Sequence, residues 1–554
     1  MHELSLLIGG KAGFGIDRSG EIIGRLFNKI GYRIYIYRDY PSIIRGGHTF
    51  SIIRISENWI AAHQDKIDFI VALNPETLEI HKSKIKKDSM CIYDSEQTGP
   101  VPGSYCLGLP LSRFIKEENA PDIMRNTCAI GALTKALGIE FGILKEILEE
   151  EFRQNIDFNL KVAKRGYDES RELIKIDPLQ QESLPFLTGN QAIALGLVKG
   201  GLNAYFAYPM TPSSPILHYL AGVANDFNLD VIHPESEISV ILMALGCIFA
   251  GKKAAVGTSG GGFCLMTEAL SLAGMAELPI VTVLGQRPGP STGLPTYSAQ
   301  TELHFALNAG HGEFPRFIAA PGDAEEAFYW SAASMNISWK YQIPSIILSD
   351  KNIGESLFNL DMNMVENLSE EKFLSWTGES PYKRYLLTEN GISPLAFPPA
   401  QNAVIKANSY EHDENGITTE DPGQTIQMQD KRMRKEKFLT QHLENIKAVN
   451  AYGAGDKDTA ILCWGSNKGV CVEIGKKLGI RVIQPVILNP FPVTQFKEAL
   501  SGVKKLISVE NNSTGQMAAL VNNHGFDVHG KILKYDGRAF SPEELEEKMK
   551  GVIL

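Results

Sequence analysis

The chain has 554 residues, of which 44% are hydrophobic and 21% charged, a composition typical of soluble globular proteins. A length this far beyond the size of a single hydrophobic core implies about three or four domains. The formal net charge of −10, without any concentrated basic face, argues against nucleic acid as the main partner.

The sequence shows neither a targeting signal nor a metal-binding cysteine motif. It opens on an apolar strand, Leu4–Ile8, without the basic and long apolar regions of a secretory signal, and no uncharged run is long enough to span a bilayer. Seven cysteines are scattered and never form C-x-x-C: Cys91, Cys106, Cys128, Cys247, Cys264, Cys463 and Cys471. We therefore expect a cytoplasmic protein with reduced thiols, and with neither an iron–sulfur cluster nor a structural zinc of its own.

The first predicted domain is an α/β block over residues 1–178. A strand, Leu4–Gly9, leads through the glycine turn Gly9–Gly15 into an amphipathic helix, Ser19–Ile30. A dinucleotide fingerprint would need a glycine where Arg18 stands, so we favour a glycine-rich turn whose free amides face an anion.

A second glycine turn follows in the same domain. Arg45 precedes Gly46 and Gly47 between two predicted strands, where it could grip a phosphate or a partner's carboxylate. A surface or interface arginine is an equally good interpretation. The polar stretch Lys175–Pro185 is predicted to be a linker.

A second α/β domain is predicted over residues 186–356. Its strands each run into a glycine, proline or acidic loop: Ala204–Ala207, Leu229–His233, Ala254–Thr258, Ile280–Leu284 and Ser345–Leu348. Because ligands of open parallel sheets bind at the carboxyl ends of the strands, we expect these loops to converge on one site.

The rest of the chain is predicted to be an extended connection followed by a third α/β domain. Residues 357–448 are rich in Asn, Glu, Pro and Lys and have weak periodicity, apart from a charged helix expected at Asp430–Val449. Alternating strands and helices return over residues 449–554. The predicted fold class is therefore α/β, with three α/β domains in one chain.

The loop Tyr208–Pro215 is the first candidate for a functional site, because three prolines alternate there with hydroxyl residues. Each proline fixes φ and removes a backbone donor, so the turn is stiff and leaves Thr211 projecting at a strand end. The plainer interpretation is that Thr211, Ser213 or Ser214 caps the helix that follows.

Glu237 is the second candidate. It opens an almost wholly apolar helix, Ile238–Ala250, so its carboxylate lies between a polar loop and a dry core. A glutamate in such surroundings suits proton sharing with the ring nitrogen of a cofactor. Alternatively, Glu235 and Glu237 only complement the helix dipole beside a cap at Ser236.

A hydrolase is a competing interpretation. The segment Gly257–Gly261 matches G-x-S-x-G, which would make Ser259 a nucleophile with His304 or His311 as its base. That class has the order Ser…Asp…His, whereas both histidines precede Asp323. The hydrolase is therefore disfavoured.

Several motifs, in this order, resemble the alpha subunit of 2-oxoacid:ferredoxin oxidoreductases: Gly189–Gly196, Tyr208–Ser214, His233–Glu237 with Gly246 and Ala250–Gly251, Thr258–Gly262 and Gln286–Thr296. The first domain, with Gly9–Gly15 and Arg45–His48, is similar to the gamma subunit of that family, fused upstream. The last domain, with Trp464–Ser466, Pro490–Pro492 and Glu510–Gln516, resembles the transketolase-C-like domain of the alpha subunit. The resemblance implies that the middle domain binds the pyrimidine half of thiamine diphosphate.

The resemblance also implies the activity. Members use thiamine diphosphate and coenzyme A to decarboxylate a 2-oxoacid oxidatively, with ferredoxin as the electron acceptor. Glu237 would bond the aminopyrimidine N1′, and Thr211 would bond the substrate carboxylate. The other implied site residues are Tyr208, Pro209, Ser259, Gly260 and Gly261 at the cofactor, Arg287 and Tyr297 at the substrate, and Arg45, Ser466, Asn467 and Asn511 at coenzyme A.

Part of the catalytic apparatus is expected on another chain. In this family the diphosphate half of the site needs a Gly-Asp-Gly motif that holds Mg²⁺, and this sequence has none. A separate beta subunit is therefore expected to carry the Mg²⁺ site and a [4Fe–4S] cluster. The resemblance implies a dimer of alpha–beta heterodimers with the active site at the subunit interface.

One departure from the family pattern bears on the substrate. In several members Gly-Leu-Pro-Thr is followed by an arginine that binds a substrate carboxylate, but here Gly293–Thr296 is followed by Tyr297. A phenol lacks the bidentate grip of a guanidinium, so either Arg287 or a beta-subunit cation takes over, or the far end of the substrate is not acidic. 2-Oxoglutarate is the leading prediction, and a non-catalytic assembly or electron-transfer scaffold is the alternative function.

Overall fold

The computed structural model describes residues 3–42, 46–101, 105–361, 363, 368, 371–453 and 458–553, so Arg45 lies outside the described residues. The chain divides into two compact units. Residues 1–187, 355–361 and 541–547 form the first unit, and residues 188–354, 362–540 and 548–554 form the second. The described residues form three β-sheets, and helices alternate with their strands along the chain, which confirms the predicted α/β class. The predicted domain boundaries stay predictions.

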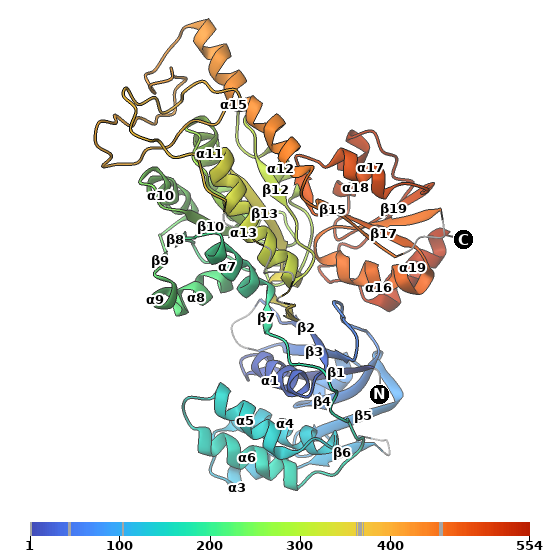
Figure 1. The fold of residues 1–554 in the computed structure, drawn as a ribbon. Helices are drawn as coiled ribbons and strands as arrows, with labels where there is room; N and C mark the ends of the chain where they lie inside the picture. Colours follow the sequence, from blue (N-terminus) through green and yellow to red (C-terminus); the bar gives the residue numbers. More distant parts are fainter. Residues whose placement is uncertain are drawn as a thin grey trace. The chain divides into compact units, whose positions relative to one another are not determined.

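An eight-stranded sheet is the centre of the first unit, in the order β6-β5-β4-β1-β3-β2-β14-β7 (Figure 1). Its strands are β1 (Glu3–Lys11), β2 (Arg33–Asp39), β3 (His48–Ser56), β4 (Ile67–Ala72), β5 (Ile85–Asp94), β6 (Cys106–Leu109), β7 (Phe186–Thr188) and β14 (Leu357–Asn359). The helices are α1 (Ile16–Lys29), α2 (Pro75–Ile80), α3 (Leu111–Glu117), α4 (Arg125–Ala136), α5 (Phe141–Glu151) and α6 (Ile156–Asp168). β1 lies between β4, its parallel neighbour, and antiparallel β3, and its interior residues are buried.

A distant segment completes this sheet. β14 pairs antiparallel with β2, with Leu357 opposite Ile36, and the Oδ1 atom of Asn359 accepts a hydrogen bond from Ile34 N at 2.6 Å. The segment predicted as an extended connection therefore begins with a strand, because Leu357 and Phe358 are apolar and become buried.

A seven-stranded sheet organises the second unit, in the order β18-β12-β13-β11-β10-β8-β9. Its strands are β8 (Ala204–Phe206), β9 (Asp230–Ile232), β10 (Ala254–Ser259), β11 (Val281–Gln286), β12 (Phe317–Ala319), β13 (Ser345–Asp350) and β18 (Ile487–Asn489). All neighbouring strands are parallel except β18 and β12. The carboxyl ends of β8, β10 and β11 therefore meet at one edge, where the candidate loops begin.

Helices surround this sheet: α7 (Gly189–Lys199), α8 (Ser214–Gly222), α9 (Ala224–Phe227), α10 (Glu237–Phe249), α11 (Gly260–Met275), α12 (Leu303–Asn308), α13 (Ala324–Tyr341) and α14 (Lys351–Glu355). Alternate residues of β8, including Ala204 and Phe206, share a hydrophobic core with α10 and α11. α10 and α11 therefore cover one face of the sheet, and this packing fixes where each helix begins.

A five-stranded sheet, β15-β17-β16-β19-β20, lies in the same unit. It is built from β15 (Val449–Tyr452), β16 (Thr459–Leu462), β17 (Arg481–Pro485), β19 (Lys505–Glu510) and β20 (Gly530–Leu533), with α16 (Lys468–Leu478), α17 (Val493–Ala499) and α18 (Gln516–Asn523). The last helix, α19 (Pro542–Ile553), has residues in both units. Leu462 and Trp464 belong to the same hydrophobic core as Ile318 and Leu488. The two sheets of this unit are thus joined by a continuous core.

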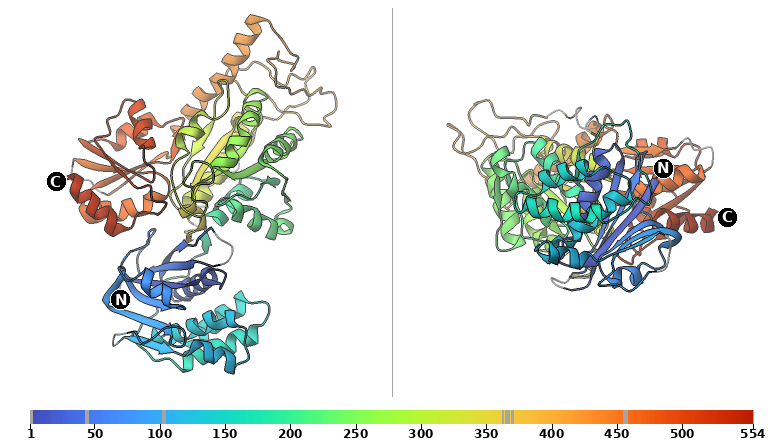
Figure 2. Two further views of the ribbon diagram at one scale, coloured as in Figure 1. Left: turned by 180° about the vertical axis from the view of Figure 1, so that it is seen from behind. Right: turned by 90° about the horizontal axis from the view of Figure 1, so that it is seen from below.

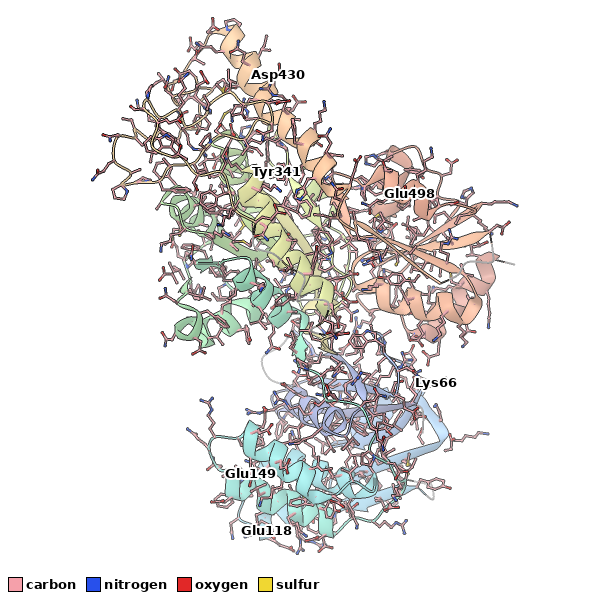
Figure 3. The ribbon with its side chains drawn as sticks, in the orientation of Figure 1. Lys66, Glu118, Glu149, Tyr341, Asp430 and Glu498 are labelled. Atoms are coloured by element: carbon pink, nitrogen blue, oxygen red, sulfur yellow. The ribbon has the colours of Figure 1, made fainter. Side chains whose placement is uncertain are left out.

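Helix α15 (Pro422–Leu443) begins and ends earlier than the helix predicted at Asp430–Val449. Asp421 caps it, since its Oδ1 atom accepts a hydrogen bond from Gln424 N at 2.8 Å. Figure 3 labels Tyr341 on α13 and Asp430 on α15, and Tyr341 Oη donates to the carbonyl of Phe438 at 3.3 Å. The missed signal was the Asp-Pro pair, which is typical of a helix N-terminus.

Two lysines of α15, Lys431 and Lys435, are buried. Lys431 Nζ donates to both carboxylate oxygens of Glu277, at 2.8 and 2.7 Å, and Lys435 pairs with the same carboxylate. Burial alone would raise the pKa of Glu277, but these two cations hold it well below its usual range. We call Glu277, Lys431 and Lys435 the α15 clamp.

The irregular segment before α15 lies along that helix, as Figure 2 shows from behind. The Nη1 atom of Arg432 donates to Glu411 Oε1 at 3.0 Å, which ties the segment to the helix. In the described part of the chain, no helix is both long and apolar enough to cross a membrane.

Candidate active site

The turn Tyr208–Pro215 connects β8 to α8 as predicted, but its hydroxyl groups do not cap the helix. Ser213 stands at the N-cap position, and its hydroxyl donates to the carbonyl of Met210 at 2.9 Å, so it bonds no amide of α8. The capping interpretation of Thr211, Ser213 and Ser214 is therefore wrong, because the turn folds back on Met210 before the helix begins.

Two side chains from other elements hold the backbone of this turn. The Nη1 atom of Arg287, in the loop after β11, donates to the carbonyl of Thr211 at 2.8 Å, and Asn190 Nδ2 donates to the carbonyl of Pro212 at 2.9 Å. Arg287 is buried, which lowers the pKa of its guanidinium. Among the described residues nothing bonds the hydroxyl of Thr211, so this hydroxyl is available to a ligand.

Glu237 is the first residue of α10 and is 5% exposed. Ser236 caps the helix, because its hydroxyl accepts a hydrogen bond from Ser239 N at 3.4 Å. A Cβ atom at Gly262 would lie 2.6 Å from Glu237 Oε1, so the carboxylate rests against the first turn of α11. No residue in the described ranges donates a hydrogen bond to it. A carboxylate in this state can form a hydrogen bond with a group from outside the chain.

The position of Ser259 contradicts the hydrolase interpretation. Its Oγ atom is buried without a hydrogen-bond partner among the described residues, and its backbone is extended, with φ −126° and ψ −179°. His304 Nε2 lies 3.2 Å from the carbonyl of Gln516, and His311 N donates to Ser271 Oγ. Neither histidine serves as a base for Ser259.

Glu302 is a site residue that the sequence did not reveal. It stands at the N-cap position of α12, is 8% exposed, and would lie 2.7 Å, through Oε1, from a Cβ atom at Gly260. Burial raises the pKa of Glu302 to about 7, although hydrogen bonds from Thr301 and the charge of Arg287 oppose the shift. No local motif marks it, because its contact with Gly260 joins distant parts of the chain.

The residues predicted at coenzyme A in the third domain form internal hydrogen bonds. Asn467 Nδ2 and Asn511 N both donate to Oε1 of Gln300, at 2.8 and 2.9 Å, and Ser466 Oγ donates to Asp350 Oδ2 at 2.5 Å. All five residues are buried. These bonds connect residues that follow β16 and β19 to the loop after β11 and to the end of β13. The role at coenzyme A stays a prediction.

Tyr297 has a cation beside it that the sequence did not indicate. The Cζ atom of Arg538 lies 3.8 Å from the centroid of the Tyr297 ring. Ser298 N donates to the carbonyl of Gly537 at 3.0 Å, which ties the two segments together. A guanidinium therefore lies beside Tyr297, at the position where the resemblance implied an arginine.

An exposed apolar surface surrounds the start of α10 and α11. It consists of large side chains that are between 41% and 50% exposed: Ile238, Leu242, Met243 and Leu265. Tyr208, whose ring packs edge-on at 6.0 Å from that of His233, is exposed as well. We call the first four residues the α10–α11 surface.

Comparison with known proteins identifies the family. A family model described as pyruvate flavodoxin/ferredoxin oxidoreductase, thiamine diphosphate-binding, matches residues 196–431, and one described as pyruvate ferredoxin/flavodoxin oxidoreductase matches residues 5–169. A 2-oxoacid:ferredoxin oxidoreductase subunit alpha from Sulfolobus sp is 31% identical over 99% of this chain and 97% of its own length. The chain belongs to the 2-oxoacid:ferredoxin oxidoreductase family.

Two further relatives of this oxidoreductase subunit carry more specific names. The 2-oxoglutarate oxidoreductase subunit KorA of Mycobacterium tuberculosis is 26% identical over 100% of this chain and 92% of its own. The solved 2-oxoglutarate:ferredoxin oxidoreductase from Magnetococcus marinus, with 2-oxoglutarate, coenzyme A and succinyl-CoA bound, matches with a TM-score of 0.91 and 30% identity over 100% of both chains. The predicted family, fold class and enzyme class are confirmed.

Proposed function

We propose that this oxidoreductase subunit, a fused gamma and alpha chain, takes part in the coenzyme A-dependent oxidative decarboxylation of a 2-oxoacid, with reduction of ferredoxin. The observation that carries the proposal is the carboxylate of Glu237, which is buried beside a glycine turn and has no donor among the described residues. Neither the non-catalytic scaffold nor the hydrolase requires such a group.

The residues around Glu237 fit the aminopyrimidine of thiamine diphosphate. The ring nitrogen N1′ is an acceptor, so the protonated carboxyl of Glu237 would donate a hydrogen bond to it. The buried Ser259 Oγ, which has no partner in the described ranges, faces the same group in our proposal. Tyr208, Pro209, Gly260 and Gly261 would border the ring. When bound, thiamine diphosphate supplies the electron sink that allows the bond between the 2-oxo carbon and the carboxylate to break.

The chain's own residues then have separate tasks. Glu237 holds a proton at the ring nitrogen N1′, in a position that excludes water because the side chain is almost fully buried. Thr211 donates a hydrogen bond from its hydroxyl to the substrate carboxylate, and Arg287 keeps the turn in place through the Thr211 carbonyl.

A second subunit is needed for the rest of the reaction. The α10–α11 surface supports this, because monomeric proteins rarely leave such large apolar side chains exposed around a site. We propose that a beta subunit covers it and brings Mg²⁺ with the diphosphate site and a [4Fe–4S] cluster that passes electrons to ferredoxin. Two alpha–beta pairs would form the complete enzyme in the cytoplasm.

The proposed substrate is a 2-oxo dicarboxylic acid, with 2-oxoglutarate the first choice. Arg538 supports this choice, since its guanidinium lies over the ring of Tyr297, with Cζ 3.8 Å from the ring centroid, and places a cation at this position. Arg287 and Arg538 each donate a hydrogen bond to a backbone carbonyl, of Thr211 and Asp536 respectively. Coenzyme A binding by Ser466, Asn467 and Asn511 is kept as a weaker proposal, because their polar groups bond within the chain.

The substitution Glu237→Gln in the complex with its beta subunit tests the function. The amide cannot take up and return the proton, so 2-oxoacid-dependent reduction of a low-potential acceptor should fall below detection while the subunits still assemble. Glu235→Gln is the matched control, because Glu235 is exposed and bonds only Ser239 among the described residues. Unchanged turnover of the Glu237→Gln complex would refute the assignment.

A further inference from the structure

Two cysteines lie side by side at one edge of the eight-stranded sheet. β5 and β6 are parallel neighbours, β6 is the last strand at that edge, and Cys91 stands directly opposite Cys106 in their register. Cys91 N donates to the carbonyl of Tyr105 at 3.1 Å, which fixes this register. Neighbouring strands are about 4.8 Å apart, and a disulfide bridges Cα atoms about 4.4–6.8 Å apart. The backbone therefore allows a bond between the two sulfur atoms.

Both thiols point to the same face of the sheet. Residues two apart on a strand share a face, so Cys91 lies with Tyr93. In the same way Cys106 lies with Gly108. A Cβ atom at Gly108 would lie 2.6 Å from Tyr93 Oη, so opposite residues of this strand pair share a face as well. The two thiols form a hydrogen bond, which lowers the pKa of Cys106 and raises that of Cys91. Cys106 is therefore the thiol that ionises more readily.

A cavity of about 260 Å³ lies beside this pair, and both cysteines line it. Cys91 is 3% exposed, whereas Cys106 is only half-buried. Because β6 is the last strand of the sheet, no further strand covers this side of Cys106 in the described part of the chain. A reagent that enters the cavity therefore reaches Cys106 first.

A second pair of contacting thiols lacks this access. Cys463, which follows β16, and Cys471, on α16, also share a hydrogen bond, and both are 0% exposed. Burial and that hydrogen bond hold the pKa of Cys471 well above its usual range. Thiol–disulfide exchange needs a reagent to reach the attacking sulfur. Of these two pairs, the one at the sheet edge combines contact with access.

We propose that Cys91 and Cys106 form a thiol–disulfide exchange site for a small disulfide: Cys106 reacts with it in the cavity, and Cys91 then closes an intrachain disulfide. The site belongs to the first unit, whereas Glu237 and Thr211 belong to the second. It is therefore a chemistry of the gamma-like part of the chain, separate from the decarboxylation of the 2-oxoacid.

The exchange proceeds in two displacements. The thiolate of Cys106 attacks one sulfur of the small disulfide, whose S–S bond breaks, and the first thiolate leaves and takes up a proton from solvent. The sulfur of Cys91 then attacks the sulfur of Cys106 in the mixed disulfide, and the second small thiol leaves with the proton that Cys91 loses. The two protein thiols are oxidised by two electrons in total, and the small disulfide is reduced to two thiols.

The test is the state of these thiols after exposure of the full chain to oxidised glutathione. Trypsin releases both cysteines in one peptide, Asp88–Arg113, because no lysine or arginine lies between them. After alkylation in denaturant, more than about nine-tenths of this peptide should carry no alkyl group and be lighter by two hydrogen atoms than the reduced peptide. Dithiothreitol should restore both thiols, and Cys463 and Cys471 should be alkylated as in the untreated chain.

Two variants separate the steps. Cys91→Ala removes the thiol that closes the disulfide, so Cys106 should retain one glutathione as a mixed disulfide. Cys106→Ala removes the thiol that reacts first, so the buried Cys91 should gain at most about one-tenth of that glutathione. Cys264→Ser is the matched control, because Cys264 is exposed on α11 in the other unit. Its loss should leave the closure of the disulfide unchanged.

Three outcomes would overturn the inference. The wild-type peptide Asp88–Arg113 could stay doubly alkylated, Cys106→Ala could carry as much glutathione on Cys91 as Cys91→Ala carries on Cys106, or Cys463 and Cys471 could oxidise to the same extent. If Cys91→Ala does not fold, oxidation of the wild-type peptide and its loss in Cys106→Ala decide the matter. The measurement needs neither a beta subunit nor a 2-oxoacid, so its result is independent of the proposed function.

Discussion

The buried carboxyl of Glu302 makes the stability of the folded chain depend on pH. Its ordinary pKa is 4.5, and burial raises it to about 7. Between these values the folded chain binds one more proton than the unfolded chain, so the free energy of unfolding falls as the pH rises. The loss is complete above about pH 7 and amounts to about 3 kcal/mol.

Glu302→Gln should therefore stabilise the chain at alkaline pH. Its urea midpoint at pH 8 should exceed that of wild type, because the amide never ionises, and the gain should shrink to about 1 kcal/mol or less at pH 5. Glu268→Gln should show no such gain, since Glu268 is exposed. Equal midpoints of wild type and Glu302→Gln at pH 8 would contradict the burial argument.

Thr211→Val removes a hydroxyl and keeps the shape of the side chain. The variant should lose one hydrogen bond to a charged group, about 1.5–3 kcal/mol, which lowers kcat/KM for the 2-oxoacid roughly ten- to hundredfold. Thr211→Ser should retain most of the activity. Since the hydroxyl bonds nothing else in the described ranges, the melting temperature should stay the same. A valine variant with full kcat/KM would remove Thr211 from the site.

At the scale of single residues, the sequence reveals those functional residues that belong to local motifs. Thr211 and Glu237 could be predicted because a proline-stiffened turn and an apolar helix are visible in a few consecutive residues. Glu302 and Arg538 could not be predicted, because the first acts through a glycine 42 positions earlier and the second through a tyrosine in another segment. Contacts of that kind exist only after the strands have been ordered in the sheet.

The first turn of α11 shows why glycine is needed in a helix. Alanine normally stabilises a helix relative to glycine by about 0.5–1 kcal/mol, yet a methyl group at Gly262 would collide with Thr258 Oγ1 and Glu237 Oε1. Gly262→Ala should therefore displace the Glu237 carboxylate and reduce turnover at least about tenfold. Turnover of the assembled complex measures this effect.

Gly222→Ala is the matched control for that substitution. Gly222 is also helical, in α8, and a Cβ atom there meets nothing within 4 Å. This variant should keep full turnover and should be as stable as wild type or slightly more so. A fully active Gly262→Ala complex would show that the carboxylate does not need its present position.

The α15 clamp should be the most sensitive point of the long helix. Glu277→Gln removes the one carboxylate that Lys431 and Lys435 share, and leaves two buried ammonium groups without it. Breaking a buried ion pair in this way costs about 3–5 kcal/mol, which a urea titration should show as a lower midpoint. Lys437→Gln, at an exposed position of α15, should have no effect. An unchanged midpoint for Glu277→Gln would contradict the role of the clamp.

Apolar strands bounded by turn residues were predictable, and the burial of lysines on α15 was not. Five of the seven strands of the seven-stranded sheet, β8, β9, β10, β11 and β13, were predicted in this way, whereas β12 and β18 were not assigned to this sheet. α15 carries lysines on the side that is buried, because their partner Glu277 lies 154 positions before Lys431. The polar sequence of α15 is therefore typical of an exposed helix, although in the structure two of its lysines are buried in an ion cluster with Glu277.

At the scale of the second unit, Gln300 connects the two sheets. Its side chain accepts from Asn467 and Asn511 N and donates to the carbonyl of Trp464 at 2.8 Å. Gln300→Ala leaves three buried polar groups without this partner, at about 1–3 kcal/mol each. Limited proteolysis should cleave the region of residues 449–540 faster than in wild type.

Gln441→Ala is the control, since Gln441 lies exposed on α15. Cleavage of Gln300→Ala at the wild-type rate would show that the shared hydrophobic core alone holds the two sheets together. The sequence identified both sheets as separate α/β blocks, but the hydrogen bonds at Gln300 depend on the three-dimensional arrangement and could not be foreseen.

The pairing of β14 with β2 bears on how a fused chain of this kind evolves. A gamma-like protein ending near residue 178 would leave β2 as an open edge, with unpaired backbone groups that favour aggregation. Here residues 357–359 satisfy that edge, and Ser541 Oγ donates to Asp65 Oδ2 at 2.5 Å from still further along the chain. A separate gamma-like chain would therefore need another strand, or a partner, to cover this edge of β2.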